Sequence, residues 1–231
     1  MRFEDTSVYN IYNAILGARN PMNSWNRSDS VFKGYNGKIE NTVIGKNDLE
    51  LMQKLIKAGS EHRKFLRQIF ISVDITAPLY WWKEFDTYKV GTVSNSTSTM
   101  HKLVSTPITT DCFEMDDFEN VCYEEFETGV EFEGLKEFAR YEVFNYWNEI
   151  IIDVLERLRM LYLKTKDKRY WKELIRLLPE SWLQKRTITM NYENILNMYR
   201  QRKNHKLTEW SKSFCDWVKT LPYAEELICL E

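Results

Sequence analysis

A strict alternation of apolar and polar residues between Ile69 and Thr76 constrains the fold more than any other stretch. Every second residue is β-branched and apolar, namely Ile69, Ile71, Val73 and Ile75. This period of two is typical of a strand with one buried face. Pro78 follows, and proline suits the first turn of a helix because its missing N–H would have no partner there. Leu79, Trp82 and Phe85 recur at helical spacing, so we expect a strand that leads directly into a helix.

The segment from Thr87 to Lys102 differs in composition, because hydroxyl, amide and basic side chains replace the apolar ones. Short hydroxyl side chains and backbone N–H groups bind phosphate and ribose oxygens, and Lys89 or Lys102 can add positive charge. A polar surface loop explains the same composition, since clusters of serine and threonine mark loops. The sequence leaves both interpretations open.

Size and composition indicate one well-packed domain covering residues 1–231. The chain is 43% hydrophobic and 14% aromatic, with a formal net charge of -2, so it lacks the basic excess that non-specific nucleic-acid binding needs. No apolar run approaches the roughly 20 residues of a membrane span, and the first ten residues are not signal-like, so we expect a cytoplasmic protein. Widely spaced cysteines and only three histidines indicate neither a metal site nor a disulfide framework. We expect reduced, buried thiols at Cys112, Cys122, Cys215 and Cys229.

Hydrophobic periodicity predicts most of the remaining elements. Helices are expected over residues 4–18, from Asn47 to Gly59, around His62 and Phe65, and over about 135–164. A shorter helix ends at Pro179, and a strand over 186–190 leads into a helix capped by Asn191. The segment 20–41 is rich in Asn, Ser and Gly, so it is not expected to be regular throughout, and we interpret it as a surface excursion. The acidic stretch 111–133 is expected to be a solvated face.

The order of the central segments resembles the flavin-dependent thymidylate synthase family. In that family a His-x-x-Phe segment precedes a strand, and a Pro-started helix containing Gln leads to Arg-His-Arg-x-x-Ser-x-Asn-Glu-x-Ser-x-Arg-Tyr. Here His62-x-x-Phe65 and Pro78 match. Glu84 stands in place of the Gln, and Thr87, Tyr88 and Lys89 stand in place of Arg, His and Arg.

The rest of the central motif is also altered. One inserted residue after Val93 places Asn95 on the family's Asn, Ser96 on its Glu and Ser98 on its second Ser; without the insertion, Asn95 falls on the Glu. Under either alignment the motif's Glu and last Arg are missing. In the family the arginines hold the flavin and the nucleotide phosphate, and a change from Arg to a neutral residue at a phosphate contact is not conservative. A different substrate or activity therefore stays open.

A second stretch matches the family more closely. Leu178-Pro179, Asn191, Asn197 and Arg202 keep the family's spacing without a gap, and Glu209-Trp210 needs one extra residue. The family uses the two Asn positions for flavin contacts and the Arg to contact the pyrimidine ring, where a fixed guanidinium stabilises a carbonyl that gains negative charge. The alternatives are a helix cap for Asn191 and an exposed helix face for Asn197 and Arg202.

The resemblance implies an α+β fold in a single domain, with a small, mainly antiparallel sheet packed with long helices. It also implies a homotetramer whose active sites form between subunits. It implies conversion of dUMP to dTMP with FAD, and with NADPH and methylenetetrahydrofolate as co-substrates, without an enzyme nucleophile. The implied cofactor contacts are His62, Thr87, Tyr88, Lys89, Asn191 and Asn197. The implied nucleotide contacts are Glu84, Asn95, Ser96, Ser98 and Arg202, with Arg202 also catalytic. A same-fold enzyme for another pyrimidine nucleotide, or a non-catalytic nucleotide-binding or interaction protein, fits the lost arginines as well.

Overall fold

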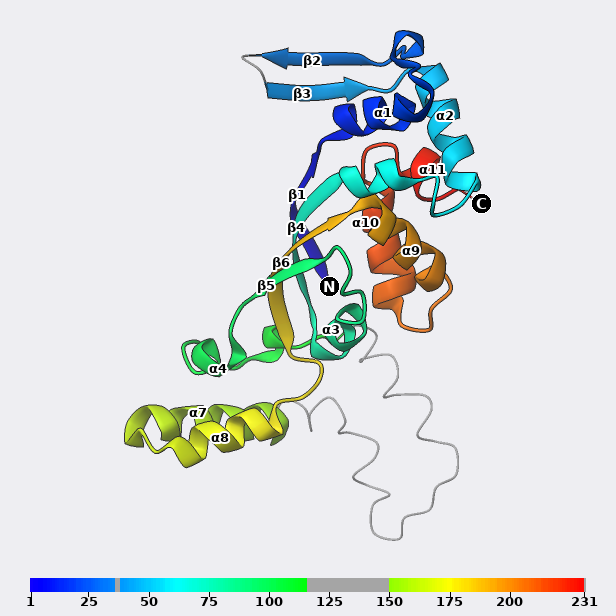
Figure 1. Ribbon diagram of the computed structural model, residues 1–231. Helices are drawn as coiled ribbons and strands as arrows, with labels where there is room; N and C mark the ends of the chain where they lie inside the picture. Colours follow the sequence, from blue (N-terminus) through cyan, green and yellow to red (C-terminus); the bar gives the residue numbers. More distant parts are fainter. Residues whose placement is uncertain (36–37, 116–149, 231) are drawn as a thin grey trace, which may run out of the picture. The chain divides into compact units, whose positions relative to one another are not determined.

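The structure, a computed structural model, describes residues 1–35, 38–115 and 150–230 (Figure 1). They form two compact units, one made of residues 1–76, 84–95 and 186–231 and the other of residues 77–83 and 96–185. Both strands and helices contribute, and the strands form a small sheet, which confirms the predicted α+β class.

The main sheet has four strands in the order β1-β4-β6-β5. Their bounds are β1 (Arg2–Tyr9), β4 (Phe70–Pro78), β5 (Val93–Ser96) and β6 (Leu183–Asn191). β1 pairs antiparallel with β4. Tyr192 N–H donates to Ile69 O at one end of the β4–β6 pair, and Thr187 Oγ1 donates to Asp74 further along, so these strands also run in opposite directions.

The central strand is the one that the alternation predicts. Ile69, Ile71, Val73 and Ile75 are all fully buried, because they point to the side of the sheet that packs against the core. Helix α3 (Leu79–Phe85) follows at once. The predicted coupling of strand and helix is therefore confirmed, with Pro78 as the last residue of the strand.

The prediction of a helix over residues 4–18 is wrong in its first half. Residues 2–9 form β1, and helix α1 (Ile11–Arg19) begins only after Asn10. Asn10 has a left-handed backbone conformation, with a φ of 71°, which is neither strand nor right-handed helix and so lies between the two elements. The register pairs Val8 with Ile71 and Phe3 with Ile75, and the Phe3 ring stacks on Trp217 with centroids 4.7 Å apart. Pairing with a distant strand outweighs local helical periodicity here.

The segment 20–41 contains more regular structure than expected. Two 3₁₀ turns, η1 (Asn20–Met22) and η2 (Trp25–Arg27), precede an antiparallel pair formed by β2 (Val31–Tyr35) and β3 (Lys38–Val43). The expectation that this segment is not regular throughout is confirmed, whereas the hairpin was not predicted. The dipeptide Asn36-Gly37 between two strand-like runs is the sequence signal that predicts such a hairpin.

A buried carboxylate of helix α2 (Lys46–Lys57) is bonded to the end of α1 and to the segment just before this hairpin. Asp48 accepts hydrogen bonds from Arg19 Nε at 2.5 Å, from the Ser28 and Ser30 hydroxyls at 2.7 and 2.6 Å, and from two backbone N–H groups of residues 29 and 30. The Asp48 side chain is fully buried. We refer to Asp48, Arg19, Ser28 and Ser30 as the Asp48 anchor.

Helix α2 ends as predicted near Gly59, whose φ of 109° suits glycine. The helix expected around His62 and Phe65 is only a 3₁₀ turn, η3 (Lys64–Gln68). Phe65 and Leu66 are buried in it, whereas His62 lies in the preceding turn and is exposed.

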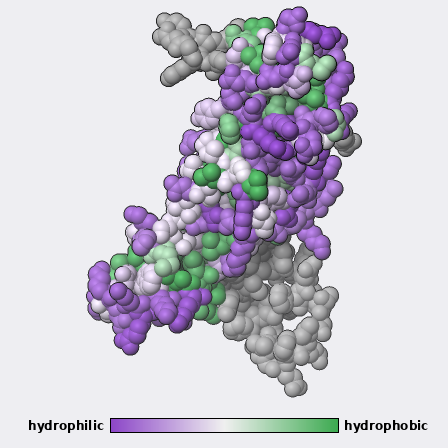
Figure 2. All heavy atoms as spheres, in the orientation of Figure 1, coloured by the Kyte–Doolittle hydropathy of each residue, from purple (hydrophilic) through white to green (hydrophobic). Residues whose placement is uncertain are grey.

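The second unit is mainly helical, with α4 (Thr99–Lys102), the 3₁₀ turn η4 (Thr110–Cys112), α7 (Asp153–Thr165) and α8 (Lys168–Leu177). Its core contains Leu103, Ile108, Phe113, Leu155 and Leu174. Met160, Leu161 and Leu177 are exposed, and Figure 2 shows hydrophobic surface over the α7–α8 pair.

Several predictions fall partly outside the described residues. Of the helix expected over 135–164, only the part from residue 150 onward is described. This part contains α7, which ends at Thr165, close to the predicted end. Most of the acidic stretch and Cys122 also lie outside the described ranges. Cys112, Cys215 and Cys229 are free thiols, and of these Cys215 is buried. Within the described ranges, no helix combines the length and the apolar character needed to span a membrane.

The last part of the first unit follows the predicted order. β6 includes the expected strand 186–190, and helix α9 (Tyr192–Arg202) follows with Asn191 as its N-cap. A π-helical turn η7 (Glu209–Phe214), α10 (Cys215–Lys219) and α11 (Ala224–Leu227) complete it. The predicted cap is confirmed, and Asn194 completes a reciprocal capping box.

Candidate functional site

The turn after α3 is attached to the start of α9. Asn194 Nδ2 donates to Val90 O at 2.6 Å. Gly91 has a φ of 75°, and a Cβ atom there would lie 3.0 Å from both Asn191 Nδ2 and Asn194 Oδ1. Glycine is required at this position because the turn passes so close to the capping box. The capping residues of α9 therefore also fix the turn that carries Tyr88 and Lys89.

Five residues from α3, this turn, the C-terminal end of α9, the turn after α9 and η7 form one polar and aromatic group. Tyr88 Oη accepts a hydrogen bond from Arg202 Nε at 2.9 Å and lies 2.9 Å from Gln201 Oε1. Arg202 Nη1 lies 3.3 Å from Glu84 Oε2, and His205 Nε2 lies 3.7 Å from Glu84 Oε1. We call Glu84, Tyr88, Arg202, His205 and Trp210 the Arg202 cluster.

Aromatic rings restrict the guanidinium further. The Arg202 Cζ atom is 4.9 Å from the centroid of the Trp210 ring and 5.6 Å from that of the Tyr88 ring, within the range of cation–π attraction. The Arg202 side chain is 19% exposed. Arg202 is thus a positioned, partly accessible cation.

Glu84 is held less completely than Arg202. Its Oε2 atom is buried and accepts no hydrogen bond within the described part of the chain, although Arg202 is close enough for an ion pair. A buried carboxylate oxygen without a donor is unfavourable. The contacts of Glu84 are therefore easier to exchange than those of a fully bonded carboxylate.

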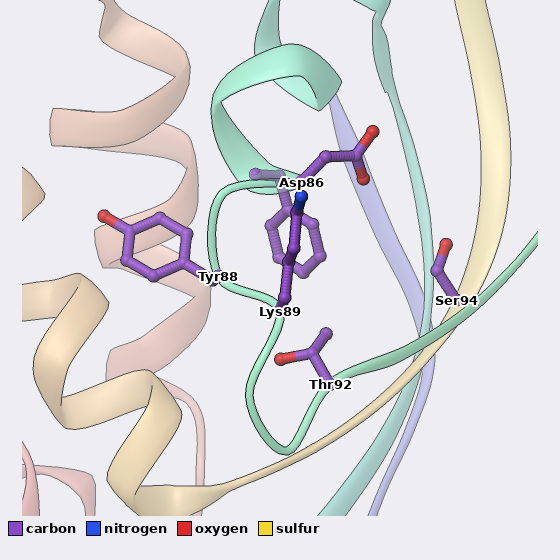
Figure 3. Close-up of a pocket in the computed structure, with 6 residues that line it drawn as sticks. Asp86, Tyr88, Lys89, Thr92 and Ser94 are labelled. Carbon is purple, nitrogen blue, oxygen red and sulfur yellow. The ribbon is translucent and has the colours of Figure 1, made fainter.

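Next to the cluster lies a small open pocket of about 150 Å³ (Figure 3). It is lined by Phe85, Asp86, Tyr88, Lys89, Thr92 and Ser94. Figure 3 shows Tyr88 on the side of the turn that faces the helices, with Asp86 and Ser94 on the other side. Thr92 Oγ1 is buried and has no hydrogen-bond partner among the described residues, while Asp86 pairs with Arg186 at 2.7 Å.

The chemistry of this pocket fits an anionic or hydroxyl oxygen. Lys89 supplies a cation, and the unpartnered hydroxyl of Thr92 supplies a donor. Pockets that enclose whole ligands measure about 300–1,000 Å³, which is larger than this one. The pocket is therefore large enough for a phosphate-sized group and too small to enclose a whole ligand.

The structure brings together some of the predicted site residues. Arg202 contacts both Tyr88 and Glu84, and Lys89 lines the adjoining pocket. The Thr87 hydroxyl donates to Glu84 O at 2.7 Å, which closes the end of α3. Thus Glu84, the acidic residue in the place of the family's Gln, has cationic and aromatic neighbours in the same chain.

The other predicted residues have separate environments. Asn191 Oδ1 accepts from Asn194 N–H as the helix cap, and Asn197 Oδ1 accepts from Arg63. Asn95 and Ser96 lie on the exposed strand β5. Ser98 is the N-cap of α4, where its hydroxyl accepts from His101 N–H at 3.1 Å.

Arg63, Gln201 and His205 were missed by the sequence interpretation. His205 follows α9 by a few residues, so its approach to Glu84 depends on the turn after that helix. Nothing in the sequence around Arg63 or Gln201 indicates their contacts, because both depend on distant elements. Within the described ranges, no group of three or more His, Cys, Asp and Glu residues could hold a metal ion.

Comparison with known proteins gives a clear answer for the fold. No protein family model matches the chain, and no curated protein matches it either. Among solved structures, flavin-dependent thymidylate synthase ThyX from Helicobacter pylori, complexed with FAD and dUMP, is similar with a TM-score of 0.64 and 18% identity over 100% of both chains. A second structure of that enzyme with FAD and dUMP, at 16% identity, gives the same TM-score over 99% of this chain and 97% of the other. The chain therefore has the fold of the flavin-dependent thymidylate synthases.

Proposed function

We propose that the protein is a flavin-dependent enzyme that acts on a dUMP-like pyrimidine nucleotide, and that its reaction is the reductive methylation of dUMP to dTMP. The observation that carries the proposal is the likeness of fold over the entire chain to enzymes complexed with FAD and dUMP. Methylenetetrahydrofolate would supply the carbon and NADPH would reduce the flavin. A homotetramer in the cytoplasm, with the site completed by a second subunit, belongs to the same proposal.

Arg202 is the proposed catalytic residue. Its Nε atom is bonded to Tyr88 and its guanidinium lies over Trp210, so the remaining N–H groups have a fixed direction. Such donors stabilise a pyrimidine carbonyl as it gains negative charge, without reorganisation during the reaction. Bound FAD, in its reduced form, would supply the hydride, and the protein would bind and orient the reactants.

The pocket beside the cluster is the proposed phosphate contact. Lys89 and Thr92 offer one cation and one unpartnered donor. Asn191, Asn197, His62 and Thr87 are proposed to contact the flavin, and Asn95, Ser96 and Ser98 the nucleotide.

The ion pair between Glu84 and Arg202 favours a second candidate, an enzyme of the same fold for another pyrimidine nucleotide. A carboxylate at this position repels a phosphate but accepts a hydrogen bond from an amino group, as on cytosine. A preference for an aminopyrimidine nucleotide over dUMP would support this candidate.

The test is anaerobic turnover with FAD, NADPH, methylenetetrahydrofolate and dUMP, with dTMP as the measured product. Arg202→Lys keeps the charge but loses the bond geometry, and we expect kcat/KM to fall by about 10²–10³-fold. The matched control is Arg200→Lys, at an exposed arginine on the same helix, and we expect it to change kcat/KM less than about twofold.

Bound FAD without dTMP formation, but with turnover of another nucleotide, would select the second candidate. Absence of flavin binding would contradict the flavin-dependent reaction and favour a non-catalytic nucleotide-binding or interaction protein.

A further inference from the structure

Arg63 links the segment before β4 to helix α9 through two side chains. Its Nε atom donates to Glu193 Oε1 at 3.0 Å, and its Nη2 atom donates to Asn197 Oδ1 at 3.1 Å. The Arg63 side chain is only 11% exposed. The guanidinium is thus bonded at one end to a carboxylate and at the other to an amide.

Glu193 fixes the position of Arg63. Its carboxylate is also bonded to Arg67 Nε. Burial would raise the pKa of Glu193, but the hydrogen bonds from Arg67 and Arg63 outweigh it and lower the pKa. The carboxylate therefore stays charged, and charge-assisted hydrogen bonds of this kind are strong and directional.

The contact with Arg63 determines how the amide of Asn197 is oriented. A guanidinium carries donors and no acceptor, so the Asn197 atom that faces Nη2 is the oxygen. The amino group then points away from Arg63. Asn197 is only partly buried, and its Nδ2 atom donates to no group in residues 1–35, 38–115 or 150–230. The amino group is therefore available to a ligand.

We propose that Arg63 is a positioning residue that holds Asn197 with its amino group toward the ligand. The ligand atom that binds this amino group is then a hydrogen-bond acceptor, such as a ring carbonyl of the flavin. The inference rests on the proposed function for the identity of the ligand. Asn191 differs from Asn197: its oxygen also accepts, from Asn194 N–H, but its side chain is buried and its amino group lies beside Gly91.

The first test needs no ligand and uses Arg67→Ala as the control for Arg63→Ala. Both changes leave Glu193 with one arginine, but only Arg63 contacts Asn197. With ¹⁵N-labelled asparagine, the side-chain amide signals of Asn197 are identified by their loss in Asn197→Asp. We expect Arg63→Ala to shift and broaden these signals and Arg67→Ala to leave them in place. Equal effects of the two variants would overturn the inference.

The second test is titration with FAD. We expect the Kd to rise about 3- to 10-fold in Arg63→Ala, as for one lost hydrogen bond, and less than twofold in Arg67→Ala. Asn197→Asp keeps the bond to Arg63 but replaces the donor with an acceptor, so we expect a rise of more than about 10-fold. Unchanged affinity in Asn197→Asp would overturn the assignment of an acceptor. If the wild-type protein binds no FAD, the proposed function fails, and the amide signals still decide the role of Arg63.

Discussion

Two carboxylates of the first unit, Asp48 and Glu84, have opposite hydrogen-bond environments. Asp48 is fully buried and accepts five hydrogen bonds from Arg19, two serines and the backbone. Glu84 is partly exposed, pairs with Arg202 at 3.3 Å and has a buried oxygen without a hydrogen bond. A carboxylate with all its hydrogen bonds made within the chain stabilises the fold. A carboxylate with an oxygen that accepts no hydrogen bond can still bind a ligand.

The largest expected effect is on the Asp48 anchor. We expect Asp48→Ala to lower the free energy of unfolding by about 3–5 kcal/mol, because it leaves the buried Arg19 without its partner. Urea denaturation measures the loss. Glu50→Ala changes an exposed carboxylate of the same helix and should cost less than about 0.5 kcal/mol. Similar losses in the two variants would contradict the structural role of the anchor.

The anchor also predicts a dependence on pH. Burial alone would raise the pKa of Asp48, but hydrogen bonds from Ser30, Ser28 and Arg19 lower it below the usual 3.8. A carboxyl whose pKa is lowered by folding stabilises the protein above its unfolded pKa, and this stabilisation is lost as the pH falls through the folded pKa. The difference in urea midpoint between the wild-type protein and Asp48→Asn should therefore be constant above about pH 5 and shrink below pH 3.8. A constant difference down to pH 2.5 would contradict this assignment.

Tyr88→Phe tests how the Arg202 cluster is held together. The change removes the hydrogen bond from Arg202 Nε and should lower the free energy of unfolding by about 1 kcal/mol. Because Arg202 loses an orienting partner, we also expect weaker binding of dUMP in the FAD-bound protein. Tyr9→Phe, at an exposed tyrosine, is the control. Unchanged nucleotide affinity in Tyr88→Phe would separate the cluster from nucleotide binding.

Glu84→Gln is expected to have the smallest effect on stability, below about 1 kcal/mol, because the pair with Arg202 is partly solvated. It removes a negative charge near the proposed phosphate contact, so we expect tighter binding of dUMP, by about 3- to 10-fold. A loss of stability as large as that of Asp48→Ala would remove the contrast between the two carboxylates.

The sequence predicts the elements that local patterns determine. The alternation from Ile69 to Ile75 and the cap at Asn191 indicate β4 and α9 correctly, since burial of one face and side-chain capping are local properties. β1 was missed because it depends on pairing with β4 across more than sixty residues of chain, and Asp5 interrupts its pattern with a φ of 50°. Such pairing leaves little trace in the local sequence.

For the candidate site, spacing to a resembled motif indicated Glu84, Tyr88 and Arg202, which the fold brings together. Spacing could not reveal that Glu84 and Arg202 form an ion pair, nor that Arg63 donates a hydrogen bond to Asn197. Those contacts join residues from different elements, and they depend on side-chain geometry that no periodicity encodes.

The most direct test of the proposed function is the visible absorption spectrum of the purified protein, before and after addition of FAD and removal of the excess. A retained flavin band, weakened in Arg63→Ala and Asn197→Asp but not in Arg67→Ala, is the predicted result. A folded protein that retains no flavin would contradict the proposed flavin-dependent reaction and leave only the shared fold.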